Sequence, residues 1–197
     1  MVPNESAVRA VLKPYHAIFA DASRAAMKQW LEIPPAQRAA LDHPRAFANV
    51  VWSLFRNEAQ VRFSGLPGVT LTHKYNTFGI VVKDQLMLRF KRVNPEGLSR
   101  NFPTQTSLKF YAQFDLPGIP AACPRAEIGW REDDVRLGLA ELSIVMRTGK
   151  HLAWRYSILE EGGTAVLAIP TKAPTVGPRK SRVRGKNVAA DRKGKRA

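Results

Sequence analysis

The sequence contains a single cysteine, Cys123, and has neither a long apolar run nor an internal repeat. One cysteine cannot form an intramolecular disulfide, which favours a reducing compartment. No stretch approaches the roughly 20 apolar residues of a membrane span. Residues 1–20 also lack the continuous apolar core of a secretory signal. We therefore expect a cytoplasmic protein with no membrane partner.

The motifs of common enzyme chemistries are also missing. The four histidines are scattered, with no pair at metal-ligand spacing. Gly149 and Lys150 lack the upstream glycine of a phosphate-binding loop. Cys123 lies in a proline-flanked segment without an evident base to activate it. We predict no catalytic residue, no metal and no cofactor.

A nuclease is the enzyme class that the residues allow us to consider. Glu58, Asp84 and Lys91 would supply two metal-binding carboxylates and a charge-stabilising lysine. The usual tripeptide of an acid, a variable residue and a lysine is absent, because Arg89 stands where the acid would be. The consecutive acids 132–134 fit a solvated turn better than a metal site. A nuclease with an atypical site is thus an alternative of second rank.

The chain is long enough for one well-buried core but short for two, and its charge is unevenly distributed. Of its 197 residues 45% are hydrophobic, and the formal net charge is +15. Residues 171–197 hold ten Lys or Arg against one acid, Asp191, which gives +9, whereas residues 1–170 carry only +6. We predict one domain over 1–170 and a basic tail over 171–197.

The first third of the chain has the apolar periodicity of helices. Asn4 can cap a long amphipathic helix that runs to about Ile33, with Pro14 marking a kink or a late start. A short helical turn near 36–41 follows, and then a helix opened by Pro44. The predicted apolar stripe of that helix contains Phe47, Val50, Val51, Leu54, Phe55 and Val61.

From Val69 the period changes to two, which is the pattern of strands. We predict strands near 69–75, 78–83, 86–93, 126–131, 138–147 and 151–159, with turns at 75–77, 83–85 and 147–150. A short helix from Pro103 to about Gln113 interrupts them, with Leu108, Tyr111 and Ala112 directed inward. The fold class is therefore α+β: N-terminal helices on a mainly antiparallel sheet of about six strands with one inserted helix.

The most specific functional signal is the tail, which buries too little apolar surface to offset the entropy of ordering. We predict that it is disordered and binds phosphate backbones without reading base sequence. A solubilising tail without a partner is the alternative. The strand near 86–93 alternates an apolar face with a mainly basic one, and the basic face could extend the same surface. The predicted nucleic-acid-binding residues are Arg179, Lys180, Arg182, Arg184, Lys186, Arg192, Lys193, Lys195, Arg196, Arg89 and Lys91.

Four short segments resemble a group of uncharacterised bacterial proteins: 45–51 (RAFANVV), 85–91 (QLMLRFK), 101–105 (NFPTQ) and 150–158 (KHLAWRYSI). The resemblance covers roughly residues 15–160 and excludes the tail. Such proteins are often encoded beside a helix-turn-helix regulator and a small zinc peptidase, in prophage, toxin-antitoxin or defence settings. The resemblance implies such a setting and assigns no catalytic residue.

Together these observations predict a non-enzymatic, nucleic-acid-associated accessory or regulatory protein. The tail would supply non-specific affinity for nucleic acid, and the domain would hold a possible protein partner. The main alternative is a toxin-antitoxin or phage-defence component that acts through protein contacts.

Overall fold

We describe the protein from a computed structural model, over residues 2–73, 78–99, 104–114 and 123–159. The predicted turn at 75–77 and the whole basic tail at 171–197 lie outside these residues. Among the described helices, none is long and apolar enough to cross a membrane.

The N-terminal half is helical and begins as predicted at Asn4, whose side chain accepts a hydrogen bond from the Ala7 N–H at 2.8 Å. Pro14 divides the expected long helix into α1 (Glu5–Leu12), a 3-10 turn η1 (Lys13–Tyr15) and α2 (His16–Glu32). Proline removes a backbone donor, which explains the break. A short α3 (Pro35–Ala40) and a long α4 (Pro44–Phe63) follow, and Pro44 occupies the first turn of α4.

Within the described residues, six strands form one sheet in the order of the chain: β1 (Val69–Thr72), β2 (Gly79–Val82), β3 (Leu86–Arg92), β4 (Arg125–Glu132), β5 (Leu139–Thr148) and β6 (His151–Ser157). All neighbours are antiparallel except β3 and β4, which run parallel. A parallel pair needs a crossover connection. The described parts of that connection are residues 93–99 and α5 (Gln105–Tyr111).

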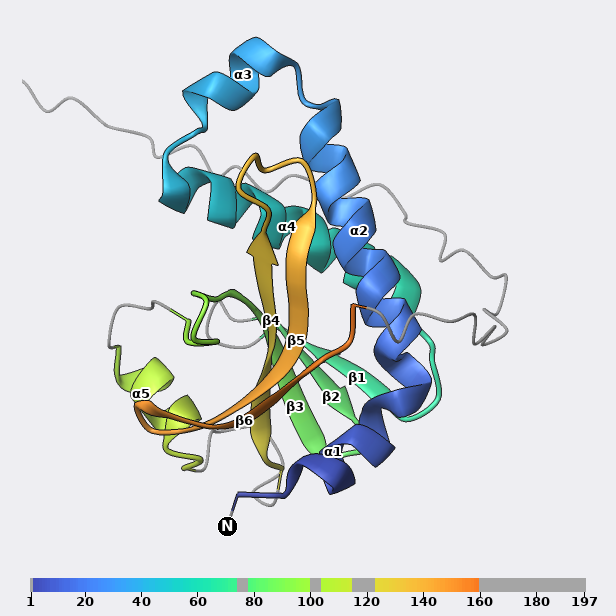
Figure 1. Cartoon of the computed structure of the whole chain (residues 1–197). Coiled ribbons are helices and arrows are strands. Elements are labelled where there is room, and N and C mark those ends of the chain that lie inside the picture. The colour runs from blue at the N-terminus through green and yellow to red at the C-terminus, as the bar shows by residue number, and fades with distance from the viewer. Residues whose placement is uncertain (1, 74–77, 100–103, 115–122, 160–197) are drawn as a thin grey trace, which may run out of the picture.

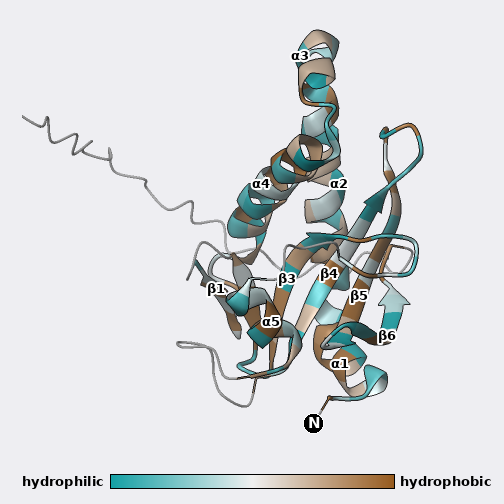
Figure 2. Cartoon of the chain, turned by 90° about the vertical axis from the view of Figure 1, so that its left-hand side faces the viewer, coloured by the Kyte–Doolittle hydropathy of each residue, from teal (hydrophilic) through white to brown (hydrophobic). Residues whose placement is uncertain are grey.

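The sheet separates two layers, as Figure 1 shows. Helices α1, α2 and α4 cover the face that we call the inner face, and their apolar residues share one core with Leu88, Phe90, Ile128 and Ile144. On the opposite face, the outer face, Phe110 and Tyr111 of α5 pack with Val81, Met87 and Cys123. Figure 2 shows the molecule from the side on which α5 lies. The predicted α+β class is confirmed.

Three predicted orientations are wrong. Val61 is 75% exposed, because the buried residues of α4 recur at every fourth position, namely Phe47, Val51, Phe55, Ala59 and Phe63. Leu108 of α5 is 44% exposed, and Ala112 at the end of α5 is exposed too, while Phe110 takes the inward position beside Tyr111. In both helices some apolar residues lie outside the buried stripe, so apolar character alone did not identify the buried positions.

Candidate functional site

The outer face holds the two domain residues predicted to contact nucleic acid. Arg89 and Lys91 alternate with Leu88 and Phe90 along β3, so the predicted basic face exists. Arg89, however, is only 5% exposed, and its guanidinium lies 3.4 Å from the centre of the Phe110 ring. Lys91 is half-buried. The prediction that Arg89 binds nucleic acid is untested, but α5 covers its side chain.

A hydrogen-bonded network connects the crossover to the sheet around Glu127, which is 1% exposed. Its carboxylate accepts bonds from the Ser99 hydroxyl at 2.9 Å and the Tyr111 hydroxyl at 2.8 Å, and lies 3.8 Å from Arg89 Nη2. Arg147 of β5 donates to the Ser99 hydroxyl at 3.1 Å and lies over the Tyr111 ring at 4.1 Å. Residues from three strands and both crossover parts thus meet at one carboxylate.

The network is rich in positive charge. Arg125 is 2% exposed and Arg147 is 9% exposed, so Glu127 shares its surroundings with several cations. Burial lowers the pKa of Arg89, and nearby Glu127 opposes the shift. Burial, and then the charge of Arg89, lower the pKa of Lys91. Burying these cations costs free energy, and the Glu127 carboxylate supplies negative charge that offsets part of it.

A second polar site lies where the parallel strands end. Because β3 and β4 are parallel, their carboxyl ends meet at the same edge of the sheet. After β3 the chain crosses the outer face, and after β4 it turns back into β5. Connections that leave in different directions open a crevice at this place, which is where open α/β sheets bind ligands. The crevice has a volume of about 530 Å³.

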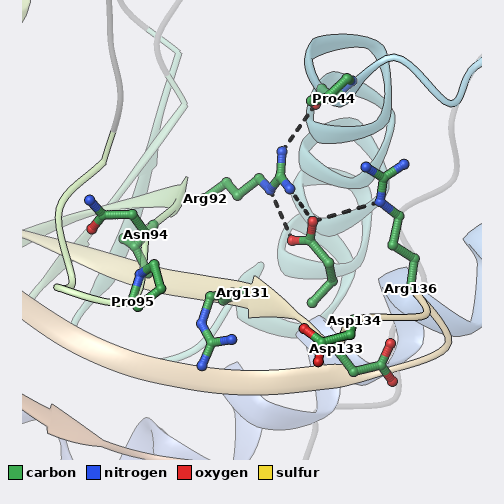
Figure 3. Close-up of a pocket in the computed structure, with 10 residues that line it drawn as sticks. Pro44, Arg92, Asn94, Pro95, Arg131, Asp133, Asp134 and Arg136 are labelled. Carbon is green, nitrogen blue, oxygen red and sulfur yellow. Dashed lines mark hydrogen bonds and ion pairs between the residues drawn. The ribbon is translucent and has the colours of Figure 1, made fainter.

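Figure 3 shows the side chains that line the crevice. Arg92 makes two hydrogen bonds to Glu132, one of them at 2.9 Å, and donates to the Pro44 carbonyl at 3.3 Å. Arg136 lies 3.9 Å from the same carboxylate and also bonds to Asp42. Glu132 is 7% exposed. The two arginines therefore share one buried carboxylate and attach the β4–β5 turn to the start of α4.

Charged side chains of both signs line the crevice. Its described lining is Pro44, Arg92, Val93, Asn94, Pro95, Arg131, Glu132, Asp133, Asp134 and Arg136. These described residues include no serine, threonine, cysteine or histidine, and their carboxylates are Glu132, Asp133 and Asp134. In the part of the chain that the structure describes, no three metal-binding side chains come together.

The predicted nuclease residues do not converge. Glu58 lies on α4, on the inner side of the sheet, and pairs with Arg62 at 2.9 Å. Lys91 points to the outer face. Asp84 lies in the β2–β3 turn with φ of 52°, as expected of a turn residue. A metal held by Glu58 and Asp84 with Lys91 beside it is therefore incompatible with this arrangement.

The remaining candidates have packing roles in the described structure. Cys123 is 1% exposed, and burial raises the pKa of its thiol to about 11, so it is a poor nucleophile at neutral pH. Trp30 and Trp130 are buried, while Trp52 and Trp154 pack at the margin of the core. His16 is buried and lies 3.2 Å from the Tyr156 hydroxyl.

Sequence reasoning missed both polar sites. Along β4, Arg125, Glu127 and Arg131 lie on one face of the strand, with Gly129 between the last two. These residues indicate a polar face on β4, but which segment of the chain covers that face depends on the strand order. Arg92, Glu132 and Arg136 have no shared motif, and only the parallel pairing brings them together.

Comparison with protein-family models, curated proteins and solved structures found no match to this chain. The resemblance to bacterial proteins of prophage and defence settings is therefore still a prediction.

Proposed function

We propose that this protein is a non-enzymatic, nucleic-acid-associated accessory or regulatory protein of the cytoplasm. Its basic C-terminal segment, residues 171–197, binds phosphate backbones without sequence preference. The folded domain holds a protein partner. The nucleic acid is bound chiefly through its charge, because cations that contact phosphates release condensed counterions but read no base edges.

The observation that carries the proposal is where positive charges outnumber acidic residues along the chain. Residues 171–197 have ten Lys or Arg against one acid. The arginines of the crevice and the open outer face are instead already paired: Arg92 and Arg136 with Glu132, and Arg131 and Arg155 with Glu141. A guanidinium that is paired with a carboxylate offers less to a phosphate, whereas residues 171–197 carry a net charge of +9 with a single acid among them.

The test compares two full-length variants with the same net charge. One variant replaces four C-terminal residues by Gln: Arg192, Lys193, Lys195 and Arg196. The other replaces four exposed residues of the domain by Gln: Lys13, Lys28, Arg45 and Lys83. Binding of unrelated DNA and RNA duplexes is measured by fluorescence anisotropy between 50 and 200 mM salt. If about five phosphate contacts form, wild-type affinity falls by about two to three decades over that range.

The two variants should behave differently. The C-terminal variant should bind more weakly at 50 mM salt and lose about one to two units of the slope of log affinity against log salt, whereas the domain variant should stay near wild type. Wild-type protein that does not bind at 50 mM salt contradicts the proposal. Equal losses in both variants would mean that only total charge matters.

A second candidate function is action through protein contacts in a toxin-antitoxin or defence system. The exposed surface at the end of the molecule that carries α3 favours it. Helix α3 has no buried residue. In the nearby β4–β5 turn, Val135 is 70% exposed and Leu137 is 58% exposed. Figure 1 shows α3 and this turn at the same end of the molecule. Exposed apolar side chains beside polar ones are typical of protein interfaces.

Capture of partners from native cells, with and without nuclease treatment, separates the two functions. A partner that survives nuclease treatment and is lost in Val135→Asp with Leu137→Asp, but not in the C-terminal charge variant, supports the second function. A partner released by nuclease supports association through nucleic acid.

A further inference from the structure

Strand β1 forms one margin of the described sheet, because it pairs with β2 alone there (Figure 2). In an antiparallel ladder the residues whose backbone groups bond to a given neighbour alternate. The Lys83 N–H donates to the Gly68 carbonyl at 2.6 Å, which places Gly68 among the residues that bond to β2. Thr70 and Thr72 follow Gly68 at steps of two and bond to β2 as well. Leu71, which lies between them, therefore turns its N–H and carbonyl toward the open side of β1.

The open side of β1 offers a place for another strand. The Val69 N–H is already used, because it donates to the Leu66 carbonyl at 3.2 Å. The Val69 carbonyl and both backbone groups of Leu71 are directed away from β2, and no described strand lies on that side to bond with them. Unpaired backbone groups along a strand are the template to which extended peptides add.

The side chains of β1 are also incompletely covered. Val69 and Leu71 lie on the inner face, at the margin of the apolar core, and both are only partly buried. Thr70 is exposed on the outer face, opposite Val81 of β2. An added strand with apolar side chains on the inner face would cover Val69 and Leu71 and extend the core.

The two margins of the described sheet differ in how they are protected. Strand β6, at the other margin, carries the exposed His151 and Arg155, and Arg155 pairs with Glu141 at 3.3 Å. Charged residues on an edge strand oppose pairing with other chains. Strand β1 reads VTLT, without a charge or a proline, and its β-branched residues favour strand pairing. The unprotected margin is therefore β1.

We propose that the edge of β1 binds an extended, acidic segment of a protein partner, which adds to the sheet as a further strand. The inference rests on the proposed function, in which the folded domain holds a protein partner, and it names the surface that holds it. Main-chain bonds to Leu71 and Val69 supply affinity, and the partner's alternate apolar residues cover the side chains of these two residues.

Charge selects this occupant over a second copy of the chain. Residues 66–73 contain no acid. The exposed Lys83 lies beside the start of β1, with its Cγ 3.4 Å from the place that a Cβ on Gly68 would occupy. A second copy would bring together two positive domains, each of net charge +6 over residues 1–170, whereas an acidic segment is attracted.

The test uses the full-length protein and a capped peptide in which Val and Glu alternate. At about 1 mM peptide, we expect NMR to show the Leu71 amide exchanging at least about tenfold more slowly than in the free protein. A peptide in which Lys replaces Glu has the same apolar face and should give no protection. Leu71→Pro removes the outward N–H while Thr70 and Thr72 still bond to β2. This variant should bind a labelled Val-Glu peptide at least about tenfold more weakly in fluorescence anisotropy.

The matched control is Ser157→Pro on β6. The Ser157 N–H also faces an open side, because the next residue, Ile158, donates to the Leu142 carbonyl of β5 at 2.8 Å. Peptide binding should keep its wild-type affinity in this variant. Equal losses in the two proline variants would overturn the assignment to β1.

A Leu71 amide that the Val-Glu peptide does not protect would overturn the proposal, and equal protection by the Lys peptide would overturn the choice of an acidic partner. A Leu71 amide that is already protected in the free protein would also overturn it. Sedimentation would then assign the edge to another part of the chain in a monomer, or to a second copy in a dimer. Capture from nuclease-treated cells tests the proposed function separately. Wild-type protein that retains no other protein contradicts the existence of a partner, whereas failure of the peptide contradicts only the surface.

Discussion

Replacing Glu127 by Gln should destabilise the protein far more than the same replacement at Glu141. Glutamine keeps the size of Glu127 but removes the charge that compensates Arg89. It can still accept one of the bonds donated by Ser99 and Tyr111, whereas its amide nitrogen cannot accept the other. An uncompensated buried charge costs about 3–5 kcal/mol and an orphaned hydroxyl about 1 kcal/mol.

The expected loss lies toward the lower end of that range. The distance of 3.8 Å between Glu127 Oε1 and Arg89 Nη2 is long for an ion pair, so we expect a loss of about 3 kcal/mol in the free energy of unfolding. For a chain of this size this lowers Tm by about 6–12 °C. Glu141 also contacts two arginines, at 3.3 and 3.5 Å, but its side chain is 17% exposed, and its replacement should cost about 1 kcal/mol or less.

Urea unfolding at pH 7, followed by circular dichroism, gives both values. Adding Arg89→Met to Glu127→Gln removes the uncompensated charge and should restore part of the loss, which a double-mutant cycle measures. The reasoning is wrong if the Glu127 and Glu141 variants differ by less than about 0.5 kcal/mol. It is also wrong if Arg89→Met lowers the stability of the Glu127→Gln variant by as much as it lowers the stability of the wild-type protein.

Three further predictions concern the tail, the cysteine and the acids considered for a nuclease. Removing residues 171–197 should leave the thermal midpoint nearly unchanged, because so basic a sequence has little apolar surface to bury; a large drop in calorimetry would show that it docks. The pKa of Cys123 rises from 9.0 to about 11 on burial, so the unfolded chain loses this proton first and stability falls from pH 9 to pH 11. Urea titrations should show Cys123→Ala gaining about 2 kcal/mol on wild type over that range, and parallel curves would contradict this. Asp84→Asn and Glu58→Gln should each leave nucleic-acid binding unchanged in anisotropy; asparagine is chosen because it tolerates the left-handed backbone of the turn. Loss of a metal-dependent cleavage in both folded variants would indicate an enzyme.

The sequence predicted most elements because their boundaries depend on local chemistry. Asn4 caps α1, Pro44 starts α4, and Lys83 and Asp84 adopt the positive φ of a tight turn. The alternation of β3 likewise placed Arg89 opposite the core. These features depend on neighbouring residues and on the two periods of the backbone, so they can be read without the tertiary structure.

The environment of Arg89 could not be predicted in the same way. Its burial depends on α5, and α5 covers the outer face because β3 and β4 pair in parallel. Nothing local distinguishes a parallel from an antiparallel pairing of these two strands. The crevice at Arg92 and Glu132 depends on the same pairing, so both polar sites were beyond the reach of local patterns.

The strand order also has a consequence for folding kinetics. Strands β1–β3 and β4–β6 are two antiparallel meanders, and within each the paired residues are close in sequence. The β3–β4 ladder instead joins residues 38 positions apart, as in Met87 with Arg125. Forming that ladder costs more loop entropy than forming either meander, so we expect it to limit the folding rate. A chain cut between β3 and β4 should therefore give two fragments that reassociate when mixed, with a rate that rises with concentration in stopped-flow fluorescence. Fragments that never regain native fluorescence would show that the covalent crossover is required for the two meanders to meet.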